Sequence, residues 1–245
     1  MKLVKVTDRI YYLQGNEETD RPFLYYIKGT DYSVAIDAGQ SKQHVEQFYK
    51  AIAEEGFLYP RYTIITHWHW DHTFGIAYIK GETIANELTK QKLMKVSEWE
   101  WSQTAMEQRE KDGEDIAFCN NCIKKEYPNL SDITVKSVDI GISQIQELNL
   151  GDIHVQLYPR DSIHSRDALL IYVPEEKALF VGDADCADCY ENGKVDMDKL
   201  KSYIQFIRGF EFDYYLLGHD YPDNKDGVMN YLKELENEAK TTINL

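Results

Sequence analysis

The chain has 245 residues, of which 43% are hydrophobic and 28% are charged. These values are typical of a globular protein with enough apolar material for a core. Acidic residues outnumber lysine plus arginine by 42 to 27, which gives a net charge of −15. Such a surface repels nucleic acid and anionic lipid, so neither is an expected partner.

The N-terminal segment is interrupted by charged residues at Lys2, Lys5, Asp8 and Arg9. It therefore lacks the unbroken apolar stretch of a secretion signal. No stretch of the chain approaches the roughly 20 apolar residues that a membrane span needs. We expect a cytoplasmic protein without a membrane partner, and the sequence does not indicate its oligomeric state.

The first third of the chain alternates short β-rich runs with turns. Tyrosine, valine and isoleucine are concentrated in these runs, which predicts strands at residues 10–13, 23–27 and 32–37. Ser41 is a typical helix N-cap, and apolar residues recur at helical spacing after it, at Val45, Phe48, Tyr49 and Ile52. The apolar run YTIIT at 62–66 predicts a buried strand.

The second half repeats this order after a charged, helical segment that we place as an insertion at about 87–130. Strands are predicted at residues 152–158, 168–173, 178–181 and 214–217, and amphipathic helices at 198–207 and 227–240. Strands followed by a helix, in both halves, predict two packed sheets with helices outside. No linker or repeat divides the chain, so we expect one domain over residues 1–245.

Three of the seven histidines fall in the segment HWHWDH, directly after the apolar run 62–66. His67 and His69 point the same way on an extended chain, whereas Asp71 and His72 need a tight bend to join them. Three imidazoles and one carboxylate this close together are costly to bury unpaired. A divalent cation removes that cost, so the segment predicts a metal site.

Three further residues with ligand chemistry stand at the ends of predicted strands. His164 precedes the strand at 168–173, while Asp183 and His219 each follow a strand and a glycine. The glycine permits an unusual backbone angle or a close approach at that point. One cleft at the strand ends could collect all of these side chains.

The order of these residues resembles that of the metallo-β-lactamase superfamily. HWHWDH matches the H-x-H-x-D-H signature of the family, and His164, GD at 182–183 and GH at 218–219 match its later motifs in order. IDAG at 36–39 is similar to its early I-D-x-G motif, in which Asp37 would support a ligand from behind. The resemblance spans nearly the whole chain and implies a four-layer αββα sandwich.

The resemblance also implies two metal ions that share one carboxylate. One ion would be held by His67, His69 and His164, the second by Asp71, His72 and His219, and both by Asp183. Nitrogen and oxygen ligands suit zinc, while iron and manganese stay open. The family's diiron oxidases generally have glutamate at the position of His69 and an added flavodoxin domain. This chain has neither, which favours a di-zinc hydrolase over a diiron oxidoreductase. The intact set of seven ligands argues against the other alternative, a non-catalytic sensor.

The expected reaction is hydrolysis of a small molecule. Water shared by two divalent ions loses a proton near neutral pH, and Asp71 would orient the resulting hydroxide or carry its proton to the leaving group. RDSIHSRD around His164 differs from the T-x-G-H-T-x-G pattern of glyoxalase II, which argues against glutathione thioesters. We expect a small ester, thioester or lactone as the substrate. Aromatic residues that flank the ligands would line a pocket or pack in the core: Trp68, Trp70, Tyr190 and Tyr221.

The four cysteines form two C-x-x-C pairs, Cys119 with Cys122 and Cys186 with Cys189. Each pair has a spacing that can grip one zinc ion. A third, structural zinc held by all four sulfurs would fasten the helical insertion to the rim of the metal centre. Reduced thiols, and disulfides formed on isolation, are the alternatives.

Overall fold

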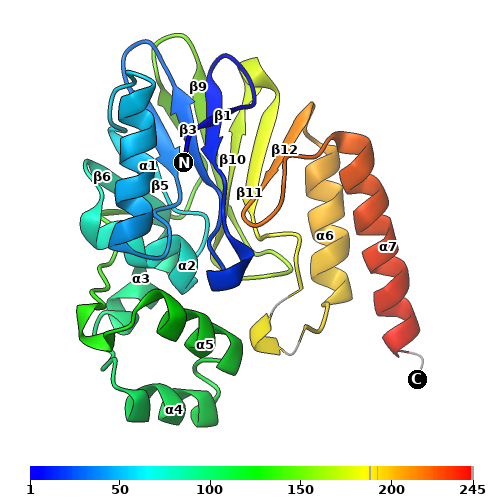
Figure 1. Ribbon diagram of the computed structural model, residues 1–245. Helices are drawn as coiled ribbons and strands as arrows, with labels where there is room; N and C mark the ends of the chain where they lie inside the picture. Colours follow the sequence, from blue (N-terminus) through cyan, green and yellow to red (C-terminus); the bar gives the residue numbers. More distant parts are fainter. Residues whose placement is uncertain (188, 192, 244–245) are drawn as a thin grey trace.

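The computed structural model describes residues 1–187, 189–191 and 193–243, and two β-sheets lie face to face within it (Figure 1). The first sheet has seven strands in sequential order: β1 (Val4–Lys5), β2 (Ile10–Leu13), β3 (Leu24–Lys28), β4 (Ser33–Ile36), β5 (Tyr62–Ile64), β6 (Glu82–Asn86) and β7 (Ile140–Ile142). The second has the order β12-β11-β10-β9-β8, with β8 (Gln146–Asn149), β9 (His154–Arg160), β10 (Ala168–Val173), β11 (Ala178–Gly182) and β12 (Tyr214–Leu217).

The direction of the strands determines at which edge of each sheet the loops that follow them lie. Strands β4, β5, β6 and β7 are parallel to one another, and β11 is parallel to β12. The carboxyl ends of parallel strands meet at one edge of a sheet, where ligands bind in open α/β sheets. The segments that follow β4, β5, β11 and β12 carry the acidic and histidine residues singled out in the sequence.

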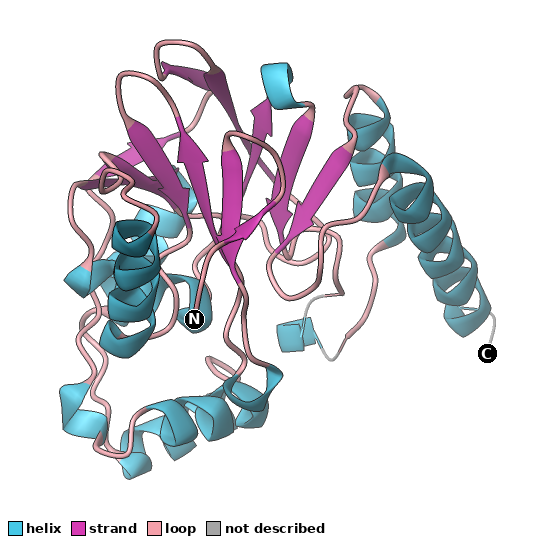
Figure 2. Cartoon of the chain, turned by 45° about the horizontal axis from the view of Figure 1, so that its top comes forward, coloured by secondary structure: helices cyan, strands magenta, loops and turns pink. Residues whose placement is uncertain are grey.

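Helices cover the outer face of each sheet (Figure 2). On the first sheet lie α1 (Lys42–Glu54) and α3 (Glu87–Val96), and on the second lie α6 (Met197–Arg208) and α7 (Lys225–Ile243). The predicted αββα sandwich is therefore confirmed. Among the described helices, none is both long and apolar enough to span a bilayer.

Alternating side chains of β3 face two different cores. Tyr25 and Ile27 point into the core between the sheets, whereas Leu24 and Tyr26 pack beneath α1. All four are buried, and burying a large apolar side chain contributes about 1.5–3 kcal/mol. Because a shift by one residue would exchange these two faces, the alternation fixes the register of the strand.

Helix α1 begins where the sequence predicts it. The Ser41 side chain accepts a hydrogen bond from the His44 backbone N–H at 3.2 Å, which caps the first turn. Val45, Phe48 and Ile52 then recur on the buried face of the helix. The Ser41 cap and the apolar spacing thus give the helix both its start and its orientation.

The predicted helical insertion contains three helices with different surroundings. Leu93 of α3 is fully buried in the core beneath that helix. Helices α4 (Gln103–Asp112) and α5 (Ala117–Glu126) lie beyond the edge of the sheets (Figure 1). They enclose a separate apolar cluster in which Met106 and Ile123 pack with Trp70 and Phe74. The insertion therefore covers the metal-ligand segment from outside.

Candidate metal centre

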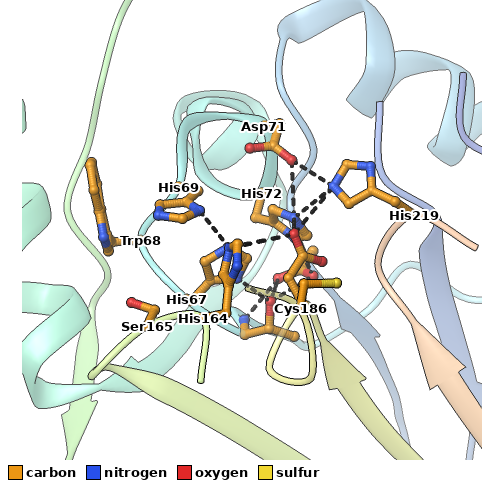
Figure 3. Close-up of polar contacts among 12 residues, drawn as sticks. His67, Trp68, His69, Asp71, His72, His164, Ser165, Cys186 and His219 are labelled. Carbon is orange, nitrogen blue, oxygen red and sulfur yellow. Dashed lines mark hydrogen bonds and ion pairs between the residues drawn. The ribbon is translucent and has the colours of Figure 1, made fainter. Parts of the chain in front are cut away.

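Loops at one edge of the sandwich bring the seven predicted ligands together (Figure 3). His67 and His69 follow β5, and His164 lies between β9 and β10. Asp183 follows β11 directly, and His219 follows β12 after Gly218. Segments separated by up to 152 residues along the chain thus meet at one point, as parallel strand ends allow.

Asp71 and His72 reach this point on a single helical turn, α2 (Trp70–Thr73). The Thr73 hydroxyl donates a hydrogen bond to the His69 carbonyl at 2.8 Å. This turn is the tight bend that the adjacent ligands require. The sequence predicted the bend but not its helical form.

The ligand atoms fall into two groups, and within each group all of them lie within 4.8 Å of one another. The first group consists of His67, His69 and His164, and the second of Asp71, His72, Asp183 and His219. His219 is the most open member, with 33% of its side chain exposed. The division is the one that the sequence resemblance implies for two ions.

Asp183 lies between the two groups. Its Oδ2 atom is 3.9 Å from Nε2 of His67 and 3.8 Å from Nε2 of His164. The same oxygen is 3.5 Å from Nε2 of His72 and 3.4 Å from Nε2 of His219. One carboxylate oxygen therefore faces histidines of both groups, which is the placement of a bridging ligand.

The polar atoms at this point fit a cation. Nε2 of His67 is buried and has no hydrogen-bond partner in the described chain. Nδ1 of His69 faces Nε2 of His164 at 3.0 Å, and Nε2 of His72 faces Nε2 of His219 at 3.3 Å. Ring nitrogens that converge on one buried space are costly to leave unpaired, and a divalent ion satisfies them together.

Two histidines of the first group, His67 and His69, are held neutral. Burial lowers the pKa of His67 well below its usual value, and the neighbouring His72 and His69 add to this effect. Burial also lowers the pKa of His69, with His164 as the next cause. Because a histidine must be unprotonated to bind a metal, His67 and His69 are ready to bind without releasing protons.

The second group holds more negative charge. Burial lowers the pKa of His72 and of His219, but nearby carboxylates outweigh it and raise both pKa values well above the usual one. Burial raises the pKa of Asp71, yet His72 and His219 outweigh it and lower that pKa. The carboxylates thus attract positive charge to this group, and a bound cation would displace the protons.

Asp37 contacts His72 of the second ligand group and holds its ring in place, as the sequence resemblance implies. Its Oδ2 atom lies 2.8 Å from Nδ1 of His72. Its Oδ1 atom accepts a hydrogen bond from the backbone N–H of Thr66 at 2.8 Å. A carboxylate on Nδ1 fixes the tautomer in which Nε2 is free to bind a metal.

Asp20 is a residue near the centre that the sequence did not reveal. Its Oδ1 atom lies 3.7 Å from Nδ1 of His219. Burial, followed by the charge of Asp71, raises the pKa of Asp20 to about 6. Asp20 stands in an early turn with no motif around it, and 198 residues separate it from His219 in the chain. Only the folded structure could bring the two together.

Gly218 provides space for the bridging carboxylate. A Cβ atom at this position would lie 2.1 Å from Oδ1 of Asp183 and 3.0 Å from Cε1 of His72. Gly218→Ala should therefore displace Asp183 and weaken metal binding by about 10–100-fold, as loss of a supporting residue does. Competition with a chelator measures this. Gly209→Ala, at the end of α6, is the control, and equal affinity in both variants would contradict the close-packing argument.

Two pockets open next to the centre. One, of about 410 Å3, adjoins the first group and is lined in part by Trp68 and Tyr190. The other, of about 550 Å3, adjoins the second group and is lined in part by Tyr221. Three of the four flanking aromatic residues therefore line pockets, whereas Trp70 is buried against Phe74.

The four cysteines, for which the sequence predicts one shared zinc ion, differ in their burial. Cys119 and Cys122 are buried on α5, Cys186 and Cys189 are exposed, and none of the four forms a disulfide. In the described chain, neither group of three or more metal-type ligands contains a cysteine. Burial raises the pKa of Cys119, which favours the thiol over the metal-binding thiolate. The structural zinc gains no support from this geometry and stays a prediction.

A two-sheet sandwich with a histidine and aspartate centre at its strand ends defines a class of metal-binding αββα proteins. The model of the metallo-beta-lactamase superfamily matches residues 20–219. The chain therefore belongs to the metallo-beta-lactamase superfamily. A comparison with curated proteins finds no match.

Solved structures share the fold at low sequence identity. A metallo-beta-lactamase from Pontibacter korlensis is 15% identical with a TM-score of 0.66, and the match covers 96% of this chain and 99% of that one. The DIM-1 metallo-beta-lactamase is 16% identical with a TM-score of 0.60 and 99% coverage of both chains. A stereoselective inverting sec-alkylsulfatase from Pseudomonas sp. is 17% identical with a TM-score of 0.70, covering 99% of this chain and 43% of its own.

Proposed function

We propose that the protein is a binuclear, zinc-dependent hydrolase of small esters, thioesters or lactones. The observation that carries this proposal is the position of Asp183, whose Oδ2 atom lies 3.4–3.9 Å from histidine nitrogens of both ligand groups. A single-ion site needs no such shared carboxylate. Nitrogen and oxygen donors without a thiolate are compatible with zinc, as with other divalent ions.

The residues of the chain divide the work at this centre. Two bound divalent ions would supply a nucleophile by lowering the pKa of water. Asp71 is held ionised by His72 and His219, so its carboxylate can accept a proton and pass it to a leaving group. Asp37 keeps the His72 ring in place, at 2.8 Å. His219, the most exposed ligand, marks the side from which a substrate can enter.

The surroundings of the centre favour a small substrate. The two adjoining pockets have volumes of about 410 and 550 Å3, within the range of small-molecule sites. A net charge of −15 opposes the approach of a nucleic acid backbone. The cytoplasmic location is a prediction from the sequence. Because a β-lactamase and a sulfatase share the fold, a β-lactam and an alkyl sulfate belong in the substrate panel.

Metal removal tests the proposal. Purified protein is expected to carry about two zinc ions per chain, and chelation should lower ester hydrolysis by about a hundredfold or more because the nucleophile is lost. Adding zinc should restore the activity. Elemental analysis and a panel of esters, thioesters and lactones measure both effects.

Other results would select other functions. Bound iron with an oxygen-dependent activity would identify an oxidoreductase. Metal-free protein that hydrolyses nothing after zinc is added would favour a sensor. Zinc-loaded protein that cleaves the β-lactam or the alkyl sulfate but no ester would retain the hydrolase and replace the substrate class.

A further inference from the structure

The pocket beside the first ligand group is lined by two cationic side chains. Lys92 of α3 and Arg166 of the loop before β10 line this pocket together with the metal-ligand candidates His69 and His164. One carboxylate, that of Glu114, lines it as well. The chain as a whole carries a net charge of −15, so the excess of positive charge in this pocket is opposite to the charge of the rest of the protein.

Among the residues that the structure describes, Lys92 has no anionic partner within ion-pair distance. Its ammonium lies 4.2 Å from the centroid of the Trp68 ring and 5.6 Å from that of Trp99. Among the contacts of the described residues, Lys92 forms neither a hydrogen bond nor an ion pair within 4.0 Å. Aromatic faces orient an ammonium but supply no oxygen to accept its hydrogen bonds. The side chain is thus held in position and, within the described part of the chain, lacks an acceptor.

Two buried carboxylates whose charge acts on Lys92 form hydrogen bonds with other groups. Asp167 accepts hydrogen bonds from Thr89 Oγ1, at 2.7 Å, and from Ser165 Oγ. Asp115 accepts the backbone N–H of the next residue at 2.8 Å and the hydroxyl of Tyr190 at 3.3 Å. Neither of them forms an ion pair with Lys92, and neither does the exposed Glu114, whose charge acts on Lys92 most strongly.

The pocket on the other side of the centre has the opposite character. Besides the bridging Asp183, three carboxylates line it: Asp185, Asp220 and Asp223. An anionic group would be repelled there and attracted toward Lys92 and Arg166. The two pockets thus distinguish the ends of a substrate by charge.

We propose that Lys92 and Arg166 bind a negatively charged oxygen group of the substrate, such as a carboxylate, located away from the bond that is hydrolysed. This inference rests on the proposed function, since it assumes that the substrate extends from the metal centre into the 410 Å3 pocket. Lys92 donates from its ammonium, and Arg166 offers its planar guanidinium. Both are specificity-determining residues rather than groups that act on the reacting bond.

A pair of matched esters tests the specificity. The zinc-loaded enzyme should have a higher kcat/KM for the mono-4-nitrophenyl ester of glutarate than for 4-nitrophenyl butyrate, which lacks the carboxylate. Lys92→Gln should lower the ratio of the two kcat/KM values about tenfold, the size expected for one charge-assisted hydrogen bond. Arg166→Gln should lower it as well, and Lys92→Arg should retain most of it. Lys95→Gln removes the same charge from an exposed position on α3 and should leave the ratio unchanged.

Binding separates this inference from the proposed function. Calorimetric titration of the zinc-loaded protein should show tighter binding of glutarate than of butyrate, and Lys92→Gln should remove that difference. Equal binding of both probes by the wild type, or a difference that survives in Lys92→Gln, would overturn the inference. A protein that hydrolyses no ester, thioester or lactone would overturn the proposed function, while the calorimetric comparison would still decide the role of Lys92.

Discussion

Replacing His67 with alanine is expected to lower the metal content from about two ions to about one per chain. His67 contributes a buried Nε2 atom without a hydrogen-bond partner in the described chain, and this atom lies 3.9 Å from Asp183 Oδ2. Loss of one ion removes several kcal/mol of transition-state stabilisation, so kcat/KM should fall by about a thousandfold. Elemental analysis and ester kinetics on the same preparation measure both effects.

The matched control for this change is His154→Ala. His154 is a histidine on β9 with 37% of its side chain exposed, and it pairs with Glu175 rather than with the centre. Its loss should change stability by less than about 0.5 kcal/mol and leave the metal content intact. His67 stands in a loop at the edge of the sheets, so circular dichroism should show native secondary structure in both variants. A His67→Ala protein with two ions and wild-type turnover would remove His67 from the site.

The histidine cluster was predictable because its signal is local. His67, His69, Asp71 and His72 lie within six consecutive residues directly after an apolar strand. Their spacing alone places them on one loop, and the cost of burying them unpaired indicates a cation. The partners across the fold were found through a second local signal, a strand followed by a glycine and a ligand-type residue at Asp183 and His219.

The edge strands β7 and β8 escaped prediction because their side chains carry no clear pattern. Strand β8 is mostly exposed, with polar residues at three of its four positions, and β7 has a glycine at its centre. Edge strands of this kind are held by backbone pairing to a neighbour, here β9 and β6. Apolar alternation, the signal used to recognise strands, reports burial and is therefore absent from exposed edges.

Asp20 and Lys92 show a further limit of the sequence. Each contacts a residue from another segment of the chain: Asp20 lies near His219, and Lys92 lies over the ring of Trp68. Neither stands in a motif, and charged residues are common throughout this chain. Their roles follow from tertiary contacts between loops, which no local pattern encodes.

A substitution of Asp71 tests the chemistry of the centre separately from the binding of its metal ions. Its Oδ2 atom lies 3.0 Å from Nε2 of His72 and 3.0 Å from Nε2 of His219. Burial opposes the charge of Asp71, but the two histidines lower its pKa and keep it ionised at neutral pH. Asparagine has nearly the same shape, lacks the charge and cannot accept a proton from water in the same way.

Asp71→Asn should therefore lower kcat by about a hundredfold or more, the contribution typical of general acid–base catalysis. The loss should be larger for an alkyl ester than for a 4-nitrophenyl ester, because a good leaving group needs little help from a proton. Metal analysis of the variant shows whether the second ion is retained, which separates proton transfer from ligand loss. Asp213→Asn removes the same charge at an exposed position next to Lys177 and should leave kcat unchanged. If Asp71→Asn retains two ions and its activity on both esters falls less than about twofold, Asp71 does not transfer the proton.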